Sequence, residues 1–369
     1  MELTGLRLAV VGPLAPPAGG MANQTRQLAE LLADEGAAVT TLQVNAPYRP
    51  QWIREVPVVR ALCRLVGYAI RLWRVTRSVQ LMHVMANSGW SWHLFAAPAI
   101  WIGSARKVPV VVNYRGGEAA AFLDRSGVLV RATMRRAAAV AVPSRFLEAI
   151  FARHAISTQV VPNIINLSRF RPSPHRIESN GNVPHLVVTR NLEAIYDIST
   201  ALRAFAIVRE TAGAARMTVA GDGPAEGQLR ALCVELGVAD EVRFCGRLDP
   251  DAVAALYRSA TVAVNPSRVD NMPNSILEAM ASGVPVVSTR VGGIPYILED
   301  GVTGLFVEPG DHRAMAAAVL RLSKDPDLER RLCAAALAEV RQYAWPAVRQ
   351  RWIDVYASVL DASSPARKA

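Results

Sequence analysis

The sequence predicts an α/β protein made of two doubly wound domains, each with a parallel sheet between helices. The chain has 369 residues, which is too long for one small core and fits two such domains. Short apolar runs that end at glycine or proline alternate with segments of helical periodicity, as in repeated β-α units. A polar stretch rich in proline, serine and asparagine, residues 171–182, interrupts this alternation and predicts an interdomain linker.

The first domain is expected over residues 1–172. Its strands are predicted from apolar runs bounded by turn residues, and its helices from amphipathic periodicity between those runs. A glycine-rich loop with Gly19 and Gly20 joins the first strand to the first helix, where backbone can approach a phosphate or a sugar. The expected strands are residues 7–12, 38–44, 79–85, 108–113 and 138–143, and the expected helices are about 23–34, 56–77, 90–103 and one that starts near 144.

The second domain is expected over residues 183–343. Tight glycine turns follow several of its apolar runs, as the Gly-Asp-Gly-Pro turn at 221–224 does. Trp345-Pro346 breaks the helical pattern before a last helix, residues 347–360. The expected strands are residues 185–189, 217–220, 242–244, 262–264 and 285–289, and the other helices are 275–282, 313–322 and 327–343.

Composition and charge restrict the compartment and the partners. No apolar run reaches the roughly 18–20 residues of a membrane span, and the first residues lack the pattern of a signal peptide. The cysteines lie far apart without metal spacing, so they are expected to be reduced thiols of a cytoplasmic protein (Cys63, Cys233, Cys245, Cys333). A net charge of +10 suits nucleic acid, an anionic membrane or phosphorylated ligands. No nucleic-acid-binding motif is present, so nucleic acid is not expected as a partner.

The stretch from residue 262 to 293 is the strongest indication of function. It predicts a β-α-β unit whose short helix is capped by Asn274 and ends at Gly283. Asp270 precedes this helix and Glu278 lies about one turn inside it, beside backbone N–H groups that suit an anion. Carboxylates next to a phosphate site are tolerated if they face sugar hydroxyls, so the unit predicts a nucleotide-sugar pocket. The alternative is that Asp270 is a turn residue and Glu278 a surface residue of the helix.

The segment PSRVDNMPNSILEAMASGVPVVSTRVGG resembles the donor-site signature of retaining GT-B glycosyltransferases of family 4. That signature has two acidic residues separated by seven others, which Asp270 and Glu278 match, with Asp in place of the usual first Glu. The resemblance implies two Rossmann-like domains facing across a cleft, with the helix at 347–360 crossing back onto the first. It implies transfer of a hexosyl or N-acetylhexosaminyl group (class EC 2.4) to an acceptor hydroxyl, with retention and without a metal or other cofactor. As donor substrate, a UDP-sugar is favoured over a GDP-sugar.

The resemblance also implies the residues of the site. Arg190 matches an arginine that grips the donor diphosphate, whereas Ile195 and Tyr196 stand where a lysine is usual. Arg115 stands where many relatives have histidine; being always protonated it cannot be a general base, but it can neutralise a phosphate or orient an acceptor. The implied catalytic residues are Asp270, Glu278, Arg190 and Arg115. The implied donor-binding residues are Gly19, Gly20, Arg190, Gly246, Asn271, Met272, Asn274, Ser275, Ile276 and Glu278.

Residues 56–77 predict a basic amphipathic helix. Its arginines are expected on one arc (Arg60, Arg64, Arg71, Arg74) and its apolar residues on the other side (Leu62, Leu65, Ala69, Leu72, Trp73). Such a helix suits an anionic membrane surface; the alternative is a helix docked on its own sheet with a solvated arginine stripe. The membrane interpretation predicts an enzyme at the inner face of the cell membrane. Its acceptor would be a lipid-linked or saccharide precursor of envelope or exported polysaccharide.

Two other functions are compatible with these residues. One is a catalytically weak sugar-nucleotide-binding scaffold of a membrane polysaccharide assembly, which Arg115 and Tyr196 favour because they replace the usual histidine and lysine. The other is a GT-B sugar-nucleotide epimerase, which needs acid and base groups in the first domain that the sequence does not reveal.

Overall fold

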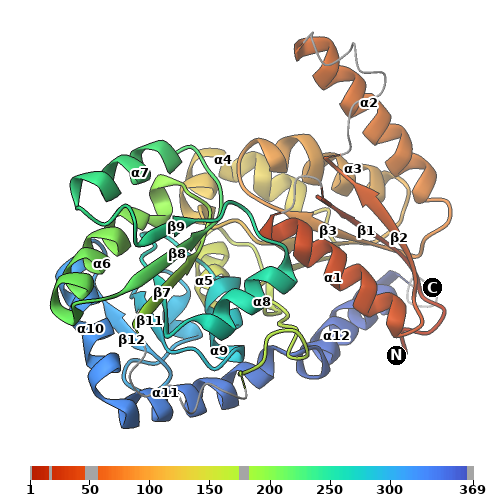
Figure 1. Cartoon of the computed structure of the whole chain (residues 1–369). Coiled ribbons are helices and arrows are strands. Elements are labelled where there is room, and N and C mark those ends of the chain that lie inside the picture. The colour runs from red at the N-terminus through yellow and green to blue at the C-terminus, as the bar shows by residue number, and fades with distance from the viewer. Residues whose placement is uncertain (1, 16–18, 46–56, 174–182, 364–369) are drawn as a thin grey trace. The chain divides into compact units, whose positions relative to one another are not determined.

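The computed structural model describes residues 2–15, 19–45, 57–173 and 183–363, and only the course of the backbone within 57–63. The chain forms two compact units (Figure 1). The first contains residues 1–163 and 345–369, and the second contains residues 164–344.

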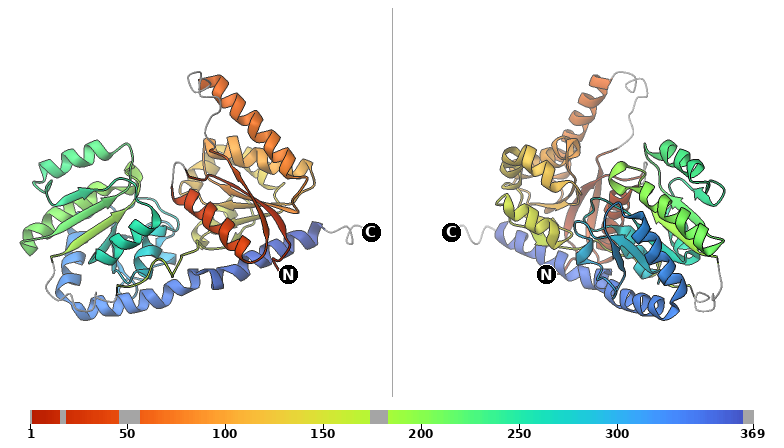
Figure 2. Two further views of the ribbon diagram at one scale, coloured as in Figure 1. Left: turned by 45° about the vertical axis from the view of Figure 1, so that its right-hand side comes forward. Right: turned by 90° about the vertical axis from the view of Figure 1, so that its left-hand side faces the viewer.

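The first unit is a parallel sheet flanked by helices. Its strands lie in the order β2 (Ala38–Gln43), β1 (Arg7–Gly12), β3 (Leu81–Ala86), β4 (Val110–Tyr114), β5 (Ala139–Val142) and β6 (Gln159–Val160). Its helices are α1 (Gly20–Asp34), α2 (Pro57–Val75), α3 (Ala97–Ala105), α4 (Ala119–Met134), α5 (Arg145–Arg153) and α12 (Trp345–Ser363). The last of these contacts β4, and Figure 2 shows it, in blue, running along the first unit.

The second unit repeats this architecture. Its parallel strands lie in the order β12 (Leu305–Val307), β11 (Val286–Thr289), β10 (Val262–Asn265), β7 (His185–Thr189), β8 (Arg216–Ala220) and β9 (Val242–Phe244). Its helices are α6 (Ile198–Ala212), α7 (Glu226–Glu235), α8 (Pro250–Ser259), α9 (Asn274–Ala281), α10 (His312–Lys324) and α11 (Pro326–Glu339). The prediction of two doubly wound α/β units is therefore confirmed.

Apolar strands covered by amphipathic helices account for each core. All residues of β3, β4 and β10 are buried, as expected for central strands of a parallel sheet covered on both faces. In the first unit the core is built around Trp92, Tyr114 and Phe151, and in the second around Phe205 and Met280. No helix within the described part of the chain has the length and apolar character needed to cross a membrane.

Each sheet has a switch point where the strand order reverses direction. In the first unit the chain moves outward from β1 to β2 and then returns to β3 on the other side of β1. In the second unit it moves from β7 to β8 and β9 and then returns to β10 on the other side of β7. Ligands of doubly wound proteins bind at the carboxyl ends of the strands beside this point. The residues after β1, β3 and β4, and those after β7 and β10, are therefore the candidates for function.

The unit boundary lies upstream of the polar stretch. The second unit begins at Ile164, and Ile165 and Phe170 are buried in its core. A hydrogen bond from Ile165 N–H to the carbonyl of Tyr343 fixes this entry into the unit. Most of the expected linker, residues 174–182, lies outside the described residues.

Several helix boundaries differ from expectation by a few residues: α11 ends at Glu339, α12 already begins at Trp345, and three others differ for a clear local reason. Helix α1 starts at Gly20, because Gly19 is extended and its carbonyl accepts from Asn23 N–H. The helix expected at 90–103 begins with a π-helical turn, Trp92–Ala96, ahead of Pro98 in the first turn of α3, where proline has no N–H for a regular helical bond. Helix α9 is capped by the extended residue Pro273, without a side-chain hydrogen bond, so that Asn274 is its first residue rather than its cap.

The C-terminal end of α9 also differs slightly. Ser282 is the cap, and Gly283 follows it with φ +67°. Glycine therefore occupies the left-handed position just beyond the cap rather than the cap itself.

Helix α2 carries its arginines differently from the predicted arc. Arg64 is half-buried: its guanidinium donates to the carbonyl of Val44 at 2.9 Å and lies 5.3 Å from the ring centre of Phe95. The prediction that Arg64 lies on a solvated arc of arginines is therefore wrong. Trp73 is 43% exposed rather than turned to the core, whereas Leu72 is fully buried. The side chain of Arg60 lies outside the described residues, as do those of Leu62 and Cys63, and residue 56 is not described at all.

Candidate functional site

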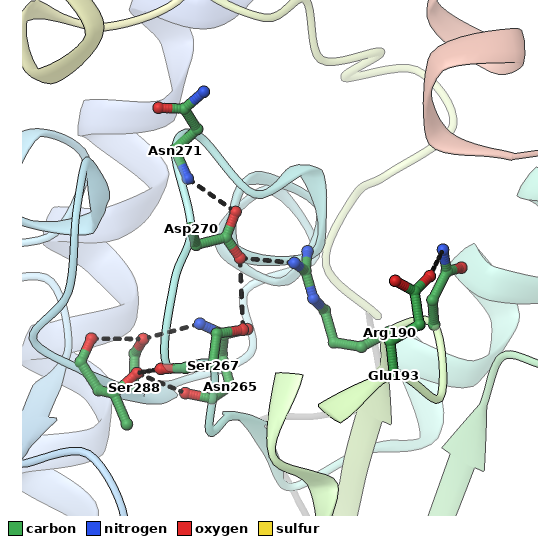
Figure 3. Close-up of polar contacts among 9 residues, drawn as sticks. Arg190, Glu193, Asn265, Ser267, Asp270, Asn271 and Ser288 are labelled. Carbon is green, nitrogen blue, oxygen red and sulfur yellow. Dashed lines mark hydrogen bonds and ion pairs between the residues drawn. The ribbon is translucent and has the colours of Figure 1, made fainter. Parts of the chain in front are cut away.

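Arg190 stands at the switch point of the second unit, directly after β7. Its side chain is only 12% exposed, and its Nη2 lies 2.6 Å from Oδ2 of Asp270, which follows β10 (Figure 3). The Asp270 side chain is 10% exposed. Two residues that are 80 positions apart are thus joined in a nearly buried ion pair because parallel neighbouring strands end at the same edge of the sheet.

The carboxylate of Asp270 is held by two further donors. The N–H of Asn271 donates to Oδ1 at 2.9 Å, and the hydroxyl of Ser267 approaches Oδ2 at 3.3 Å (Figure 3). Ser267 is completely buried, and its one hydroxyl proton can go either to Asp270 Oδ2 or to Oδ1 of Asn265, which lies 3.0 Å away. These bonds fix the loop after β10, so that Asp270 presents a preorganised negative charge to Arg190. Ser267 belongs to the site although it was not singled out in the sequence.

Two glycines after β11 allow this loop to pack tightly. A Cβ at Gly292, where φ is +54°, would overlap the carbonyl oxygen of Asp270, and a Cβ at Gly293 would overlap that of Asn271. Gly293 N–H donates to the Asp270 carbonyl at 3.0 Å. The close approach of two backbones therefore requires glycine at both positions.

Replacing Gly293 by alanine is expected to push the Asp270 loop away. Overpacking of this kind costs about 1–3 kcal/mol of unfolding free energy, and the displaced carboxylate should also lower activity. Urea unfolding and turnover measure the two effects. Gly227→Ala is the matched control, because a Cβ there meets no atom within 4 Å and helix α7 favours alanine. Wild-type stability and activity in Gly293→Ala would contradict the role of this contact.

The ring of Tyr196 stacks on the guanidinium of Arg190. The Arg190 guanidinium carbon lies 4.0 Å from the centre of the Tyr196 ring. Tyr196 stands where the resemblance expects a lysine, so this chain has one cation braced by an aromatic ring in place of two cations. A stacked guanidinium keeps its charge and its plane, and it leaves its edges available for hydrogen bonds.

Glycine packing joins the ends of β7, β8 and β9. A Cβ on Gly221 would overlap the carbonyl oxygen of Arg190, and the φ of Gly221 is +152°. Gly221 N–H donates to the carbonyl of Gly246 at 2.8 Å, and Gly246 has φ +64°. Gly246 therefore lies at the same strand-end edge as Arg190, two strands away, held by backbone contacts rather than side chains.

Glu278 is half-buried in α9, eight positions after Asp270. Burial raises the pKa of Glu278 from the ordinary 4.5 to about 7, and the nearby charges of Arg190 and Arg169 oppose this shift. The fully buried Tyr257 of α8 is also close enough for the Glu278 charge to raise its pKa. The structure thus brings Asp270, Glu278 and Arg190 together. Arg169 and Tyr257 join them, although nothing in the sequence pointed to either.

The remaining donor-site candidates fall into two groups. Met272 and Ile276 are 5% and 1% exposed and belong to the hydrophobic core, so only their backbone can contact a ligand. Asn271, Asn274 and Ser275 lie at the start of α9. Two buried polar atoms in this region, Oγ of Ser275 and Nε of Arg190, have no hydrogen-bond partner among the described residues. Such atoms mark a place where a polar ligand can bind.

In the first unit, the candidate residues also lie at strand ends. Gly19 caps α1, which follows β1, and Gly20 is the first residue of that helix, whereas Arg115 follows β4. Arg115 Nε donates to Oδ1 of Asn113 at 2.7 Å. His83, on β3, is completely buried and contacts the ring of Trp352. It is therefore a structural residue of its strand and not exposed to a ligand.

Within the described ranges, no group of three or more His, Cys, Asp or Glu residues has a geometry that could hold a metal ion. Cys233 and Cys245 are free thiols, and the side chain of Cys63 is outside the described part of the chain.

Family models match both halves of the chain. The model described as "Glycosyl transferases group 1" matches residues 183–325, which contain Arg190, Asp270 and Glu278. The model described as "Glycosyl transferase 4-like domain" matches residues 19–163, which contain Gly19, Gly20 and Arg115.

Sequence relatives match parts of the chain. The D-inositol 3-phosphate glycosyltransferase of Streptomyces griseus is 33% identical over 175 residues, which are 47% of this chain and 36% of that protein. The protein of the same name from Streptomyces avermitilis is 29% identical over 218 residues, which are 54% of this chain and 46% of that protein. The matched region is thus less than half the length of either relative.

Solved structures match almost the whole chain in fold. Sucrose-phosphate synthase from Thermosynechococcus elongatus has a TM-score of 0.79 and 22% identity, covering 97% of this chain and all of the other. Anabaena HepE in complex with UDP-glucose has a TM-score of 0.73 and 16% identity, covering 96% of this chain and all of the other. At these identities the likeness shows the fold alone, and that fold is GT-B.

Proposed function

We infer that this chain is a glycosyltransferase with the GT-B fold that moves a sugar from a nucleotide-sugar donor to an acceptor hydroxyl. The observation that carries the proposal is the cluster of Arg190, Asp270 and Glu278 at the strand-end edge of the unit matched by the group 1 model. A cation, a preorganised carboxylate and a helix start together suit the diphosphate, the sugar and the ribose of such a donor.

Arg190 is proposed to bind the donor diphosphate and to stabilise it as a leaving group. Its Nη2 is neutralised by Asp270, while its Nε has no partner among the described residues. The helix N-terminus at Asn274 and Ser275 supplies further donors to the same anion. Charge that develops on the leaving diphosphate is then met by fixed protein groups, which is usually the largest electrostatic contribution to such a reaction.

The ion pair implies an exchange of partners on donor binding. The Arg190 guanidinium would then donate to the diphosphate instead of to Asp270. The Asp270 oxygen that Arg190 leaves could accept hydrogen bonds from sugar hydroxyls. Asp270 keeps the donors Asn271 N–H and Ser267 Oγ throughout, so it remains in place when Arg190 turns to the ligand. The buried carboxylate therefore serves as a stand-in for the donor anion.

Glu278 is proposed to bind the ribose hydroxyls. With a pKa of about 7 it is partly protonated near neutral pH, and two ribose hydroxyls in place of lost water would stabilise its ionised form. The reaction is proposed to proceed with retention at the anomeric carbon, with a diphosphate oxygen taking the acceptor proton. No histidine is then needed at position 115, where Arg115 can only donate hydrogen bonds.

Binding of the donor is the direct test. UDP-, GDP- and ADP-sugars should be compared by thermal shift, because a ligand at a hundred times its Kd stabilises the fold by about 2.7 kcal/mol. We expect UDP-sugars to raise Tm most; Anabaena HepE, which has this fold, was solved with UDP-glucose. If no nucleotide sugar raises Tm, the proposal fails.

A scaffold without turnover is the second candidate, supported by Arg115 and Tyr196 in the positions of a usual histidine and lysine. It predicts donor binding without release of nucleoside diphosphate, which a coupled assay with candidate acceptors measures. An epimerase would instead convert the donor sugar without any acceptor. Release of nucleoside diphosphate only when acceptor is present would exclude both.

Helix α2 supports a membrane-bound location of the enzyme and a lipid-linked acceptor. Val66, Ile70 and Trp73 form an exposed apolar stripe, at 51%, 46% and 43% exposure, on the side away from the buried Tyr68 and Leu72. Three arginines of this segment are exposed, Arg71 and Arg74 on α2 and Arg77 just after its end. The N-terminal end of α2 extends beyond the rest of its unit (Figures 1 and 2). Apolar residues flanked by arginines match the boundary of an anionic bilayer.

The triple change of Arg71, Arg74 and Arg77 to glutamine is expected to weaken binding to anionic vesicles roughly a hundredfold. Each cation near such a surface contributes about 1 kcal/mol, and salt should weaken the wild type in the same way. Co-sedimentation with phosphatidylglycerol vesicles measures the effect. The control removes three exposed charges from the second unit (Arg313, Arg321, Arg331). Equal loss in the control, or no binding by the wild type at low salt, would leave a soluble acceptor as the better proposal.

A further inference from the structure

Arg115 ends a chain of buried hydrogen bonds whose directions are fixed by chemistry. A guanidinium only donates, so the oxygen of the Asn113 amide must face Arg115 Nε, at 2.7 Å. The amide nitrogen of Asn113 then faces Nε2 of His83 at 3.0 Å, and this ring nitrogen must accept. The proton of His83 is therefore on Nδ1, which lies 2.8 Å from the hydroxyl of Tyr356 in α12.

None of the side chains in this series of hydrogen bonds carries a negative charge. Asn113 and His83 are completely buried, and burial, followed by the charge of Arg115, lowers the pKa of His83 to about 3, so the imidazole is neutral. Burial also raises the pKa of Tyr356 well above its usual range, so the phenol is neutral. The positive charge of Arg115 is thus anchored by hydrogen bonds but not balanced by them.

The guanidinium lacks a counter-charge within the described residues. Burial lowers the pKa of Arg115 to about 9, and no acidic side chain counteracts that shift. Its Nη1 is buried and has no hydrogen-bond partner in the described part of the chain. Even a half-buried cation without an anion is costly, and its unpaired buried N–H adds to that cost. Arg190 shows the contrast: it also follows an inner strand of its sheet, β7, but there Asp270 supplies the anion.

The surroundings of Arg115 are polar and closely packed. Arg115 N–H donates to the carbonyl of Ala86 at 2.9 Å, which ties the end of β4 to the end of β3. A Cβ on Gly116 would overlap the hydroxyl of Ser88, which itself lies 2.7 Å from the hydroxyl of Tyr114. Hydroxyl groups and a cation therefore gather at one strand-end edge, beside the switch point of this sheet.

We propose that Arg115 binds an anionic group of the acceptor, a phosphate or a carboxylate, and that Asn113 and His83 are positioning residues that orient it. That the anion belongs to the acceptor rests on the proposed glycosyltransferase function, whereas the anion site itself does not. The anion supplies the counter-charge that Arg115 lacks. Because Arg115 is only half-buried, the anion can approach the part of the side chain that is exposed to solvent.

Ion binding is tested on the full chain with arginine labelled with 15N. The Nε–Hε signal of Arg115, identified by its loss in Arg115→Gln, is followed during titration with inorganic phosphate and with acetate at constant ionic strength. Saturating UDP, or the Arg190→Ala background, keeps phosphate from reporting the donor site. We expect a saturable shift that chloride does not produce. An Arg115 signal that neither ion moves would overturn the proposal.

Asn113→Asp is the discriminating variant. It keeps the shape of the side chain but places a carboxylate beside Arg115, and His83 can adapt by donating from Nε2. We expect anion affinity to fall at least tenfold while Tm is maintained, because the counter-charge is now internal. A purely structural role for the chain predicts no change in anion affinity. The exposed Arg125→Gln in the same unit controls for the general loss of a charge.

The choice of acceptor shows whether the site prefers a phosphate or a carboxylate. It also tests the anion site separately from the proposed glycosyltransferase function. Nucleoside diphosphate release is compared for glucose, glucose 6-phosphate and glucuronate with the wild type and Arg115→Gln. We expect one anionic sugar to be preferred at least tenfold by the wild type, and the preference to vanish in the variant with donor affinity unchanged. Equal use of glucose overturns the anion proposal but keeps the glycosyltransferase. Failure to bind any donor overturns the glycosyltransferase, while the ion titration still decides the anion site.

Discussion

Arg190→Ala is expected to lower turnover by roughly 10²–10³-fold and to weaken binding of the nucleotide-sugar donor. Removing one preorganised donor from a site where negative charge develops typically has an effect of this size. Arg190 is the cation that the structure fixes between Asp270 and the ring of Tyr196, so no neighbouring side chain in that arrangement can replace it. Steady-state kinetics and calorimetric titration with the donor measure the two effects.

The same substitution should also destabilise the fold, which has to be separated from catalysis. Without Arg190, the Asp270 carboxylate is left nearly buried and unpaired, and breaking a buried ion pair in this way costs about 3–5 kcal/mol. The double variant Arg190→Ala, Asp270→Asn removes that charge and should recover much of the stability but none of the activity. Arg209→Ala, which breaks an exposed pair with Glu241, is the matched control. Donor binding and turnover at wild-type levels in Arg190→Ala would assign the arginine to structure alone.

Local sequence patterns predicted ten of the twelve strands that the structure describes, the turns, and the short helix that carries Glu278, but they missed the short edge strands β6 and β12. Those features depend on neighbouring residues: apolar runs of a few residues, glycine and proline at their ends, and one short helix. The two-sheet fold follows from them, because β-α units in succession form parallel sheets. The start of α9 shows the limit of this reasoning, since Asn274 has the preferred side chain of a cap but the extended backbone lies at Pro273.

Contacts between distant residues were not predictable from such patterns. Arg190 and Asp270 were assigned to different parts of the donor, and nothing in the spacing of 80 residues indicated that they pair in its absence. A helical wheel places Arg64 on one arc with the other arginines. In the structure, however, its guanidinium turns toward the sheet and donates to the carbonyl of Val44, just after β2. The chain from Arg115 to Tyr356 joins three elements, and only the folded sheet brings them into line.

Glu278→Gln is expected to make the protein more stable and less active at the same time. In the folded chain burial raises the pKa of Glu278 to about 7, against an ordinary value of 4.5. Between these values the folded state holds a proton that the unfolded state has released, so this group's contribution to stability falls as pH rises from 4.5 and is lost above about 7. Glutamine has the same shape and no charge. The variant should therefore match the wild type at low pH and exceed it above pH 7, by an amount on the order of 2 kcal/mol.

Activity should change in the opposite direction. If the Glu278 carboxylate accepts hydrogen bonds from the ribose, an amide replaces one acceptor oxygen with a donor, and turnover should fall at least about tenfold, equivalent to roughly 1.4 kcal/mol of barrier. Groups that cost stability and serve binding are typical of functional sites. Urea unfolding from pH 5 to 8.5 and donor titration of the same samples measure both sides. Glu235→Gln at the end of α7, which is exposed, should change neither. A Glu278→Gln protein that gains stability and keeps full turnover would show that Glu278 is a half-buried carboxylate without a part in donor binding.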